Sequence, residues 1–258
     1  MYETDPVARK VLLMAETTSK GRKSRPRLSR ESVLRAAVAV ADTGGVSALT
    51  IRTLAQELGV KPMSVYYYVS AKDEILDGIV DLVFSEIELP AIGGEWRSEM
   101  LRRAHSVRRV LRSHRWAIGL LESRPNPGPA SLRHHDVVLG TLAAAGFSPT
   151  MAAHAYAVID SFTYGFALQE ASLPFEGPGA GSDLIDPIVA RFTDDSTYPH
   201  LAAMVTDHYG SPDYDFGDEF SFGLDLILGA LDASLSQPRT AGSSPRPAVT
   251  STSRQHQD

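Results

Sequence analysis

Residues 49–72 have the sequence LTIRTLAQELGVKPMSVYYYVSAK, and this stretch decides the fold of the N-terminal part of the chain. Its first half has the spacing of a short helix with one buried face, formed by Leu54, Ala55 and Leu58. Gly59 is expected to end that helix, and Pro62 suits the first turn of the next one, where its missing N–H is not needed. Two short helices joined by a glycine turn are typical of a helix-turn-helix, whose second helix lies in the major groove of DNA. The sequence therefore predicts a recognition helix that runs from Pro62 to about Val69.

Helical patterns continue on both sides of this stretch. A first helix is expected after Ser29, a residue type that caps helix N-termini, and Gly44–Gly45 is expected to end it. Its apolar face comprises Val33, Leu34, Ala37, Val38 and Ala41. A fourth helix over 71–88 has an apolar stripe of Ile75, Leu76, Ile79, Val80, Val83 and Ile87. We expect a three-helix DNA-binding domain over residues 29–75, with the fourth helix as a bridge to the rest of the chain.

Charge is divided unevenly between the two ends of the chain. The net charge is −6, but residues 1–75 carry 12 Lys/Arg against 8 Asp/Glu, whereas residues 76–258 carry 13 against 23. Clustered positive charge binds the phosphates of nucleic acids by releasing counterions. We expect residues 1–28 to form a flexible basic arm that contacts DNA. A tail that only improves solubility would have a similar composition.

The second half of the chain is also predicted to be helical, beyond a boundary at Pro90 and Gly93–Gly94. Helices are expected over 96–114, 131–145, 149–172, 201–209 and 215–236, with shorter segments over 116–123 and 186–192. Residues 237–258 are rich in Ser, Thr and Pro and are expected to be disordered. No stretch predicts a strand. The predicted fold class is all-α, with the helix-turn-helix domain followed by a larger helical domain over 95–236.

Composition and missing motifs exclude several classes of protein. The chain has no cysteine, which excludes disulfides and thiolate metal sites, and 43% hydrophobic residues, which suffice for a buried core. No apolar run approaches the roughly 18 residues of a membrane span, and the N-terminus lacks the pattern of a signal peptide. No G-x-S-x-G, H-E-x-x-H or phosphate loop is present, so we do not expect an enzyme. We expect a cytoplasmic protein with no membrane partner, cofactor or metal.

The predicted recognition helix carries side chains that suit DNA. Ser64 can hydrogen-bond to any base, Met63 can contact a thymine methyl group, and tyrosine hydroxyls reach phosphate oxygens. An aromatic core is the alternative for residues 66–68, but three consecutive residues of a helix span about 300° and cannot all face inward. The predicted DNA-binding residues are Arg25, Arg27, Thr50, Arg52, Lys61, Pro62, Met63, Ser64, Tyr66, Tyr68 and Lys72.

The block from Val33 to Val83 resembles the TetR family of bacterial transcriptional repressors. The segments LTIRTLAQELGV, KPMSVYYYV and SAKDEILDGIVD agree with that family in order and spacing. The resemblance implies that the family's usual DNA-contacting positions are Thr50, Arg52, Ser64, Tyr66, Tyr68 and Lys72. It also implies that Arg22–Arg30 can act as the arginine-rich arm that some members use.

The second half is similar to the ligand-binding domain of the tetracycline-repressor subgroup. The similar segments are AAAGFSP (143–149), IDSFTYGFALQEAS (159–172) and FSFGLDLILGALDA (220–233). The resemblance implies a dimer built on a four-helix bundle of the long helix and the last helix, with a ligand inside each subunit. The positions that match the subgroup's magnesium–tetracycline ligands hold Leu120, Ser161 and Gln169, of which only the amide of Gln169 suits magnesium. We therefore expect a partly apolar effector other than magnesium-bound tetracycline.

Candidate effector-binding residues are amphipathic or aromatic side chains of the second domain. They are Trp116, His134, Tyr156, Phe162, Phe166 and Gln169. The alternative for each aromatic is an ordinary place in the core, and the alternative for the histidine is a hydrogen-bonded core or surface position. His134 and its neighbour His135 point in different directions on a helix, so they do not form a metal-binding pair.

The function expected from these features is a ligand-responsive regulator of transcription. A dimeric repressor would bind a near-palindromic operator in double-stranded DNA and leave it when a small molecule binds. The alternative is a helical ligand-binding or scaffold protein without specific DNA binding. The exposed and basic residue types at positions 52, 64, 66 and 72 favour the regulator.

Overall fold

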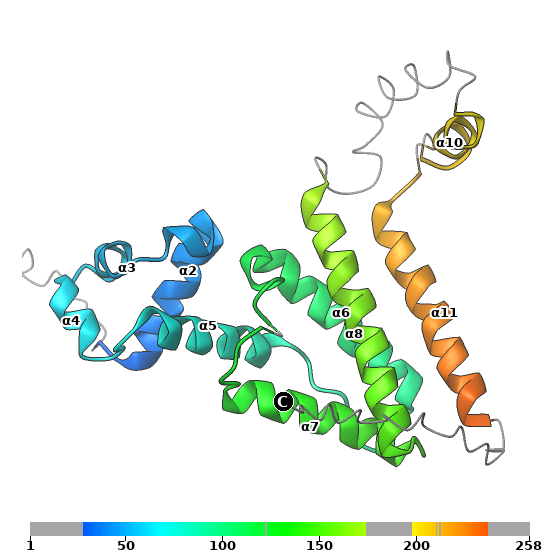
Figure 1. The fold of residues 1–258 in the computed structure, drawn as a ribbon, viewed down its shortest axis with the longest axis horizontal. Coiled ribbons are helices and arrows are strands. Elements are labelled where there is room, and N and C mark those ends of the chain that lie inside the picture. The colour runs from blue at the N-terminus through cyan, green and yellow to red at the C-terminus, as the bar shows by residue number, and fades with distance from the viewer. Residues whose placement is uncertain (1–27, 122, 174–197, 210, 212, 237–258) are drawn as a thin grey trace, which may run out of the picture.

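All regular structure in the described part of the chain is helical, which confirms the predicted fold class. The computed structural model describes residues 28–121, 123–173, 198–209, 211 and 213–236, shown in colour in Figure 1. Except for Leu28, the expected N-terminal arm lies outside the described residues, as do the expected helix over 186–192 and the expected tail over 237–258.

The helices follow the expected order. The N-terminal part contains α2 (Arg30–Ala48), α3 (Ile51–Leu58), α4 (Pro62–Tyr66) and α5 (Lys72–Glu86). The second part contains α6 (Trp96–Ser113), the 3-10 turn η1 (Arg115–Ala117), α7 (Pro129–Ala144), α8 (Pro149–Ser172), α10 (Pro199–Met204), the π-helical turn η2 (Val205–Tyr209) and α11 (Phe216–Ser236).

Local chemistry explains where the first helices begin and end. The hydroxyl of Ser29 accepts the N–H of Ser32 and caps α2, and Thr50 caps α3 in the same way through Thr53. Gly59 ends α3 in the left-handed conformation at φ 64°. The predicted break of the first helix at Gly44–Gly45 is confirmed at Gly45, which leaves helical geometry at φ 70°, although further helical turns follow it to Ala48.

The bridging helix α5 contributes to two hydrophobic clusters. Its first half, with Ile75 and Ile79, packs into the helix-turn-helix core beside Leu34 and Leu54. Its second half packs with residues of α6 and η1 through Val80, Val83, Phe84 and Ile87. Every residue of its predicted apolar stripe is buried. A movement of α5 would therefore change the packing of both parts of the molecule.

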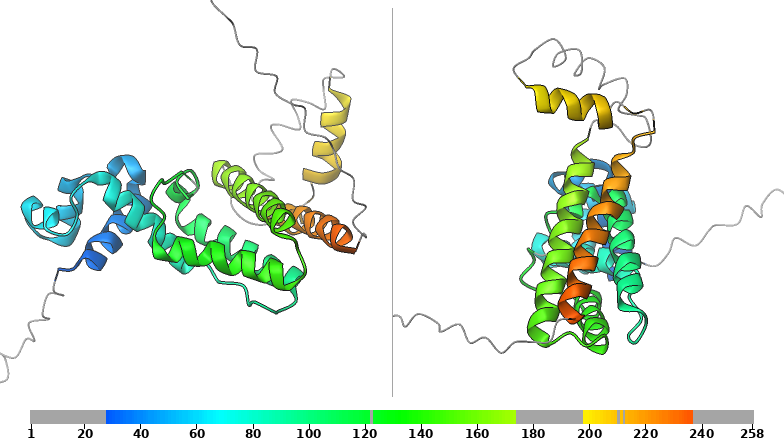
Figure 2. Two further views of the ribbon diagram at one scale, coloured as in Figure 1. Left: turned by 60° about the horizontal axis from the view of Figure 1, so that its bottom comes forward. Right: turned by 90° about the vertical axis from the view of Figure 1, so that its right-hand side faces the viewer.

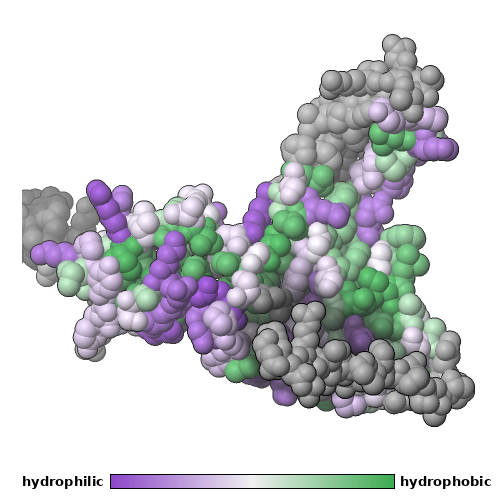
Figure 3. Space-filling model, viewed as in Figure 1, coloured by the Kyte–Doolittle hydropathy of each residue, from purple (hydrophilic) through white to green (hydrophobic). Residues whose placement is uncertain are grey.

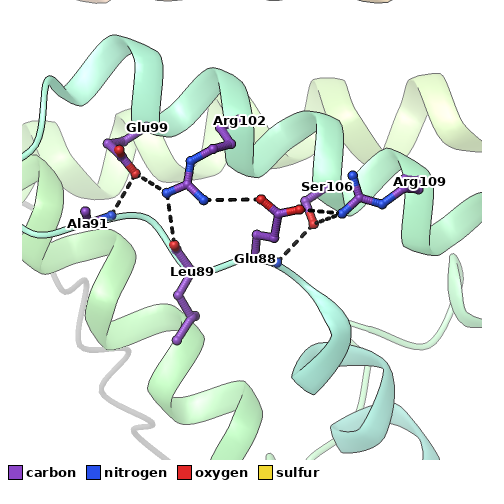
Figure 4. Close-up of polar contacts among 7 residues, drawn as sticks. All are labelled: Glu88, Leu89, Ala91, Glu99, Arg102, Ser106 and Arg109. Atoms are coloured by element: carbon purple, nitrogen blue, oxygen red, sulfur yellow. Dashed lines mark hydrogen bonds and ion pairs between the residues drawn. The ribbon is translucent and has the colours of Figure 1, made fainter.

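Polar contacts fasten the connection between α5 and α6 (Figure 4). Glu88 forms ion pairs with Arg102 and Arg109 of α6, and its backbone N–H donates to the hydroxyl of Ser106. Arg102 also pairs with Glu99 and donates to the carbonyl of Leu89. These contacts hold the start of the linker along the side of α6.

The second part is a helical bundle whose core lies between α6, α7, α8 and α11. Both views in Figure 2 and the view in Figure 1 show α8 and α11 side by side, with α6 next to them. The core comprises Trp96, Met100, Ala104, Val138, Leu142, Phe147, Ala152, Ala155, Ile159, Phe166, Phe220, Leu224 and Leu228. Within the described ranges, no helix is both long enough and apolar enough to cross a membrane.

Candidate nucleic-acid interface and buried polar cluster

The helix-turn-helix presents a strongly exposed face on α4. Val65 is completely buried in the domain core, whereas Met63 is 77% exposed and Tyr66 is 50% exposed. Lys61, Pro62 and Ser64 are also exposed, as is Arg52 on α3. Large apolar and aromatic side chains that remain in water beside basic residues favour contact with a partner.

Five of the predicted DNA-binding residues are exposed on α4 or at its N-cap: Lys61, Pro62, Met63, Ser64 and Tyr66. The hydroxyl of Thr50 is exposed but caps α3, and the ammonium of Lys72 lies 3.5 Å from the carbonyl oxygen of Val46. Both groups are therefore partly engaged within the chain. Arg25 and Arg27 lie outside the described residues.

The tyrosines differ in part from the expected arrangement, and α4 ends at Tyr66 rather than near Val69. Tyr68 is half-buried and packs against the domain core, so it is less exposed than expected. Tyr67 is 85% exposed, although it was not among the predicted contacts. Counted from buried Val65 at about 100° per residue, Tyr67 lies opposite the core and Tyr68 lies near it, so the helical spacing agrees with both exposures.

The six candidate effector residues do not form one site. Trp116 lies beside the helix-turn-helix domain, where its Nε1–H donates to Asp42 at 2.6 Å. Phe162 and Phe166 pack on Phe220 of α11, and Gln169 is exposed on α8. His134 and Tyr156 both contact the guanidinium of Arg103.

Arg103 is the centre of a buried polar cluster formed by α6, α7 and α8. Its Nη1 and Nη2 donate to the two carboxylate oxygens of Asp160 at 2.6 Å and 3.0 Å, and the two side chains are 1% and 7% exposed. Its Nε donates to Nε2 of His134 at 3.0 Å, and its guanidinium lies 5.4 Å from the centre of the Tyr156 ring. Tyr164 donates its hydroxyl to Asp160 at 3.2 Å.

The state of His134 follows from these contacts. Burial lowers the pKa of His134 to about 3, and the neighbouring positive charge of Arg103 acts in the same direction, so the ring is neutral near pH 7. Because Nε2 accepts from Arg103, the single ring proton is on Nδ1. Nδ1 is buried and has no hydrogen-bond partner among the described residues. The cluster therefore contains a donor that is free to bind an acceptor.

Burial would lower the pKa of Arg103, but the carboxylate of Asp160 and its hydrogen bonds outweigh burial and raise it. The cluster is thus an ion pair with a neutral histidine beside it. Arg103 and Asp160 were not predicted as site residues. Asp160 could have been found, because an acid inside the apolar sequence AYAVIDSF indicates a buried partner.

A second ion pair lies nearer the end of α6. Arg108 donates to both carboxylate oxygens of Glu170 at 2.6 Å and 3.0 Å, and its guanidinium lies 5.0 Å from the centres of the Phe166 and Phe220 rings. It also donates to the carbonyl of Gly217 at the start of α11. Arg108 therefore links α6, α8 and α11, and Phe166 packs against its guanidinium.

Two family models match the chain. The model described as bacterial regulatory proteins, tetR family, matches residues 33–79. The model described as tetracyclin repressor-like, C-terminal domain, matches residues 89–235. The chain belongs to the TetR family. It is accordingly a DNA-binding transcriptional regulator with a helix-turn-helix, and the family is not one of enzymes.

Relatives in the TetR family match over most of their length. An HTH-type transcriptional regulator of Saccharopolyspora erythraea is 35% identical over 182 residues, which are 70% of this chain and 76% of the relative. The HTH-type transcriptional repressor DrrR1 of Streptomyces coeruleorubidus is 31% identical over 244 residues, or 90% of this chain and 88% of the relative. The crystal structure of the TetR family protein ActR from Streptomyces coelicolor in complex with actinorhodin is 25% identical, with a TM-score of 0.67, over 82% of this chain and 100% of ActR.

In this TetR family member, polar contacts hold the connection between η1 and α7 against the bridging helix α5. Arg124 donates to Asp77 at 2.5 Å and to Asp73 at 3.0 Å, both on α5. One turn further along, Asp81 accepts the backbone N–H of Ser131 at the start of α7. Acids four residues apart on α5 thus hold a loop of the second part against the helix that follows the recognition helix.

Proposed function

We propose that this protein is a dimeric repressor that binds a near-palindromic operator and is released from it by a small molecule. The observation that carries the proposal is the exposed face of α4, where Met63, Tyr66 and Tyr67 remain in water while Val65 is buried. A face of this kind, which protrudes from a small domain, suits the major groove. The basic residues Arg52 and Lys61 border it and suit phosphates.

Dimerisation is supported by apolar side chains on the outer face of α8 and α11. Val158 and Leu168 on α8 are 47% and 57% exposed, and Phe222 and Leu226 on α11 are 65% and 61% exposed. Figure 3 shows hydrophobic residues along α11 on this side of the bundle. Exposed apolar patches of this kind are typical of protein interfaces. The same face of a second copy would cover them and build a four-helix bundle about a two-fold axis.

The buried polar cluster is the proposed effector site. Replacing a buried ion pair by apolar residues is often neutral or stabilising, so Arg103 and Asp160 are costly unless they have a further role. The unused Nδ1–H of His134 suits a carbonyl or carboxylate oxygen, and the ring of Tyr156 suits an aromatic body. The complex of the similar protein ActR with actinorhodin supports an organic effector for this chain.

Magnesium-bound tetracycline does not suit this chain. The corresponding positions hold Leu120, Ser161 and Gln169, and Ser161 and Gln169 are exposed. In the described ranges, no group of three His, Cys, Asp or Glu side chains is placed to hold a metal. We therefore propose an aromatic effector with an acceptor oxygen that needs neither metal nor cofactor. Because a repressor acts on the chromosome, its proposed location is the cytoplasm.

Selection of DNA from a random library with the full chain, at a fixed salt concentration, tests the proposed function. Recovery of a palindrome with half-sites about one helical turn apart would support a dimer with two recognition helices. Failure to enrich any sequence would contradict the proposal and favour a helical scaffold or ligand-binding protein without specific DNA binding.

The recovered operator then tests the effector site. A screen of aromatic carboxylic acids and quinones for operator release should find active compounds, whereas tetracycline with magnesium should release nothing. The activity of a releasing compound should fall at least about tenfold in His134→Leu, the cost of losing about one charge-assisted hydrogen bond. Unchanged release by this variant would move the site away from the cluster.

A further inference from the structure

The end of α6 is fastened to both the helix-turn-helix domain and the bridging helix through one histidine. His114 directly follows α6, and its side chain is 9% exposed. Its Nδ1 lies 2.8 Å from Oδ1 of Asp42 on α2, and its Nε2 lies 3.1 Å from Oε2 of Glu86 at the end of α5. A single side chain therefore joins three helices from the two parts of the molecule.

Trp116 reinforces the same junction. Its Nε1–H donates to Oδ1 of Asp42 at 2.6 Å, and the centre of its ring lies 6.1 Å from that of His114. The indole nitrogen can only donate, so this contact does not depend on pH. The histidine is the member of the junction whose hydrogen bonds change with protonation.

The geometry requires a doubly protonated ring. A neutral imidazole donates from one nitrogen and accepts at the other, whereas the imidazolium donates from both. Ionised carboxylates only accept, so contacts to Asp42 and Glu86 are both made only by the imidazolium. Burial lowers the pKa of His114, but the hydrogen bonds and charges of Asp42 and Glu86 outweigh burial and raise it above its ordinary value.

We propose that His114 is a protonation-dependent latch that holds the helix-turn-helix domain and the bridging helix against the end of α6. Loss of the proton leaves one carboxylate facing a ring lone pair, so the latch opens on that side. The charged groups that contact the ring are Asp42 from α2 and Glu86 from α5, which are 32% and 52% exposed, and no other charged contact to the ring is seen among the described residues.

The sign of the effect follows from the raised pKa. The latch is closed below pH 6.5, the ordinary pKa of histidine, and it opens as the pH rises through the higher value in the folded protein. A latched domain has less freedom to lose when two recognition helices engage an operator. Operator affinity should therefore fall as the pH rises above 6.5, a consequence that rests on the proposed function.

Histidine NMR of the full chain tests the latch without DNA. Titration of ¹³C-labelled histidine rings, with the His114 signal identified by its loss in His114→Asn, should give a His114 midpoint above 6.5. Asp42→Asn should lower this midpoint, whereas the control His200→Asn, at an exposed histidine of α10, should not change it. A midpoint at or below 6.5, or one that Asp42→Asn leaves unchanged, would overturn the proposal.

Operator binding tests the consequence for function. The affinity of the wild-type protein should fall by about three- to tenfold between pH 6.5 and pH 8.5, the effect of about one partly exposed charged hydrogen bond. His114→Asn should bind with the weaker affinity at both pH values, and His200→Asn should behave as the wild type does. An equal pH dependence in the wild type and in His114→Asn would overturn the coupling to DNA binding. If no operator exists, the NMR titration still decides whether the latch forms.

Discussion

At the residue scale, the burial of Arg103 with Asp160 is the most costly arrangement in the second part of the chain. Burying an ion pair costs more free energy than burying an apolar pair of similar volume. The exception is an ion pair that has good geometry and whose remaining donors and acceptors are hydrogen-bonded. Here the pair is bidentate, and His134 and Tyr164 take further bonds. The pair and its partners therefore hold α6, α7 and α8 in one arrangement around the proposed effector site.

A double substitution tests how this pair affects stability. Asp160→Leu leaves a buried charge without a partner and should lower the free energy of unfolding by about 3–5 kcal/mol. The double variant Arg103→Met/Asp160→Leu removes both charges and should recover most of that loss. Urea unfolding of both variants provides the measurement. A double variant as unstable as Asp160→Leu would show that Arg103 is not the group left uncompensated.

His134 should make the protein sensitive to acid. Its pKa is about 3 in the folded protein, whereas an unfolded chain has the ordinary value of 6.5. Between these values the unfolded chain binds the proton and the folded protein does not, so stability is present above pH 6.5 and is lost as the pH falls. The slope should be about 1.4 kcal/mol per pH unit. Thermal unfolding of His134→Gln between pH 4 and pH 7 should show a clearly shallower dependence, and an unchanged slope would contradict the buried neutral ring.

At the element scale, apolar periodicity predicted the helices well and their ends less well. The stripe on α5 and the apolar face of α11 were correctly identified because burial of one face sets the spacing. The end of α4 was misplaced because Val65 and Val69 are both buried, although Val69 lies beyond the helix. Contacts between residues that are distant in the sequence, such as Arg103 with Asp160, leave no periodic pattern from which they could be predicted. For this reason the candidate effector residues proved to lie in three separate parts of the structure.

Gly128 should be needed for the close contact between the start of α7 and Asp81 of α5. It precedes α7, and a Cβ atom there would overlap the carboxylate of Asp81, which accepts the N–H of Ser131. Gly128→Ala should displace this carboxylate and cost about 1–3 kcal/mol, the range for overpacking. Gly119→Ala is the control, because no heavy atom would lie within 4 Å of its Cβ. Equal unfolding midpoints for the two variants would contradict the claim that Gly128 is needed for this contact.

At the scale of the whole molecule, α5 is the element that joins the DNA-binding domain to the proposed effector domain. The first half of α5 packs into the helix-turn-helix core, and its second half packs against α6 and η1. Arg124, in the loop before α7, donates a hydrogen bond to Asp77 of α5. Repacking around Arg103 would shift α7 and, through Asp81, act on α5. By linkage, an effector that weakens operator binding is itself bound more weakly when the operator is present.

The N-terminal segment should add affinity without specificity. Residues 20–27 contain five basic residues, and removal of residues 1–27 should weaken operator binding. The slope of log affinity against log salt should become shallower by about 0.9 for each phosphate that the truncated protein no longer neutralises. Fluorescence anisotropy at several salt concentrations gives this slope. The same slope before and after truncation would show that the segment does not contact DNA.

The most direct test of the central claim is the affinity of Tyr66→Ala for the selected operator, measured beside its sedimentation as a dimer. The variant should bind about five- to 150-fold more weakly, because a side chain at the groove supplies roughly 1–3 kcal/mol. It should still sediment as a dimer, since α8 and α11 are unchanged. Tyr198→Ala, which changes an exposed tyrosine remote from α4, should bind as the wild type does. Wild-type affinity in Tyr66→Ala would contradict the assignment of α4 as the recognition helix.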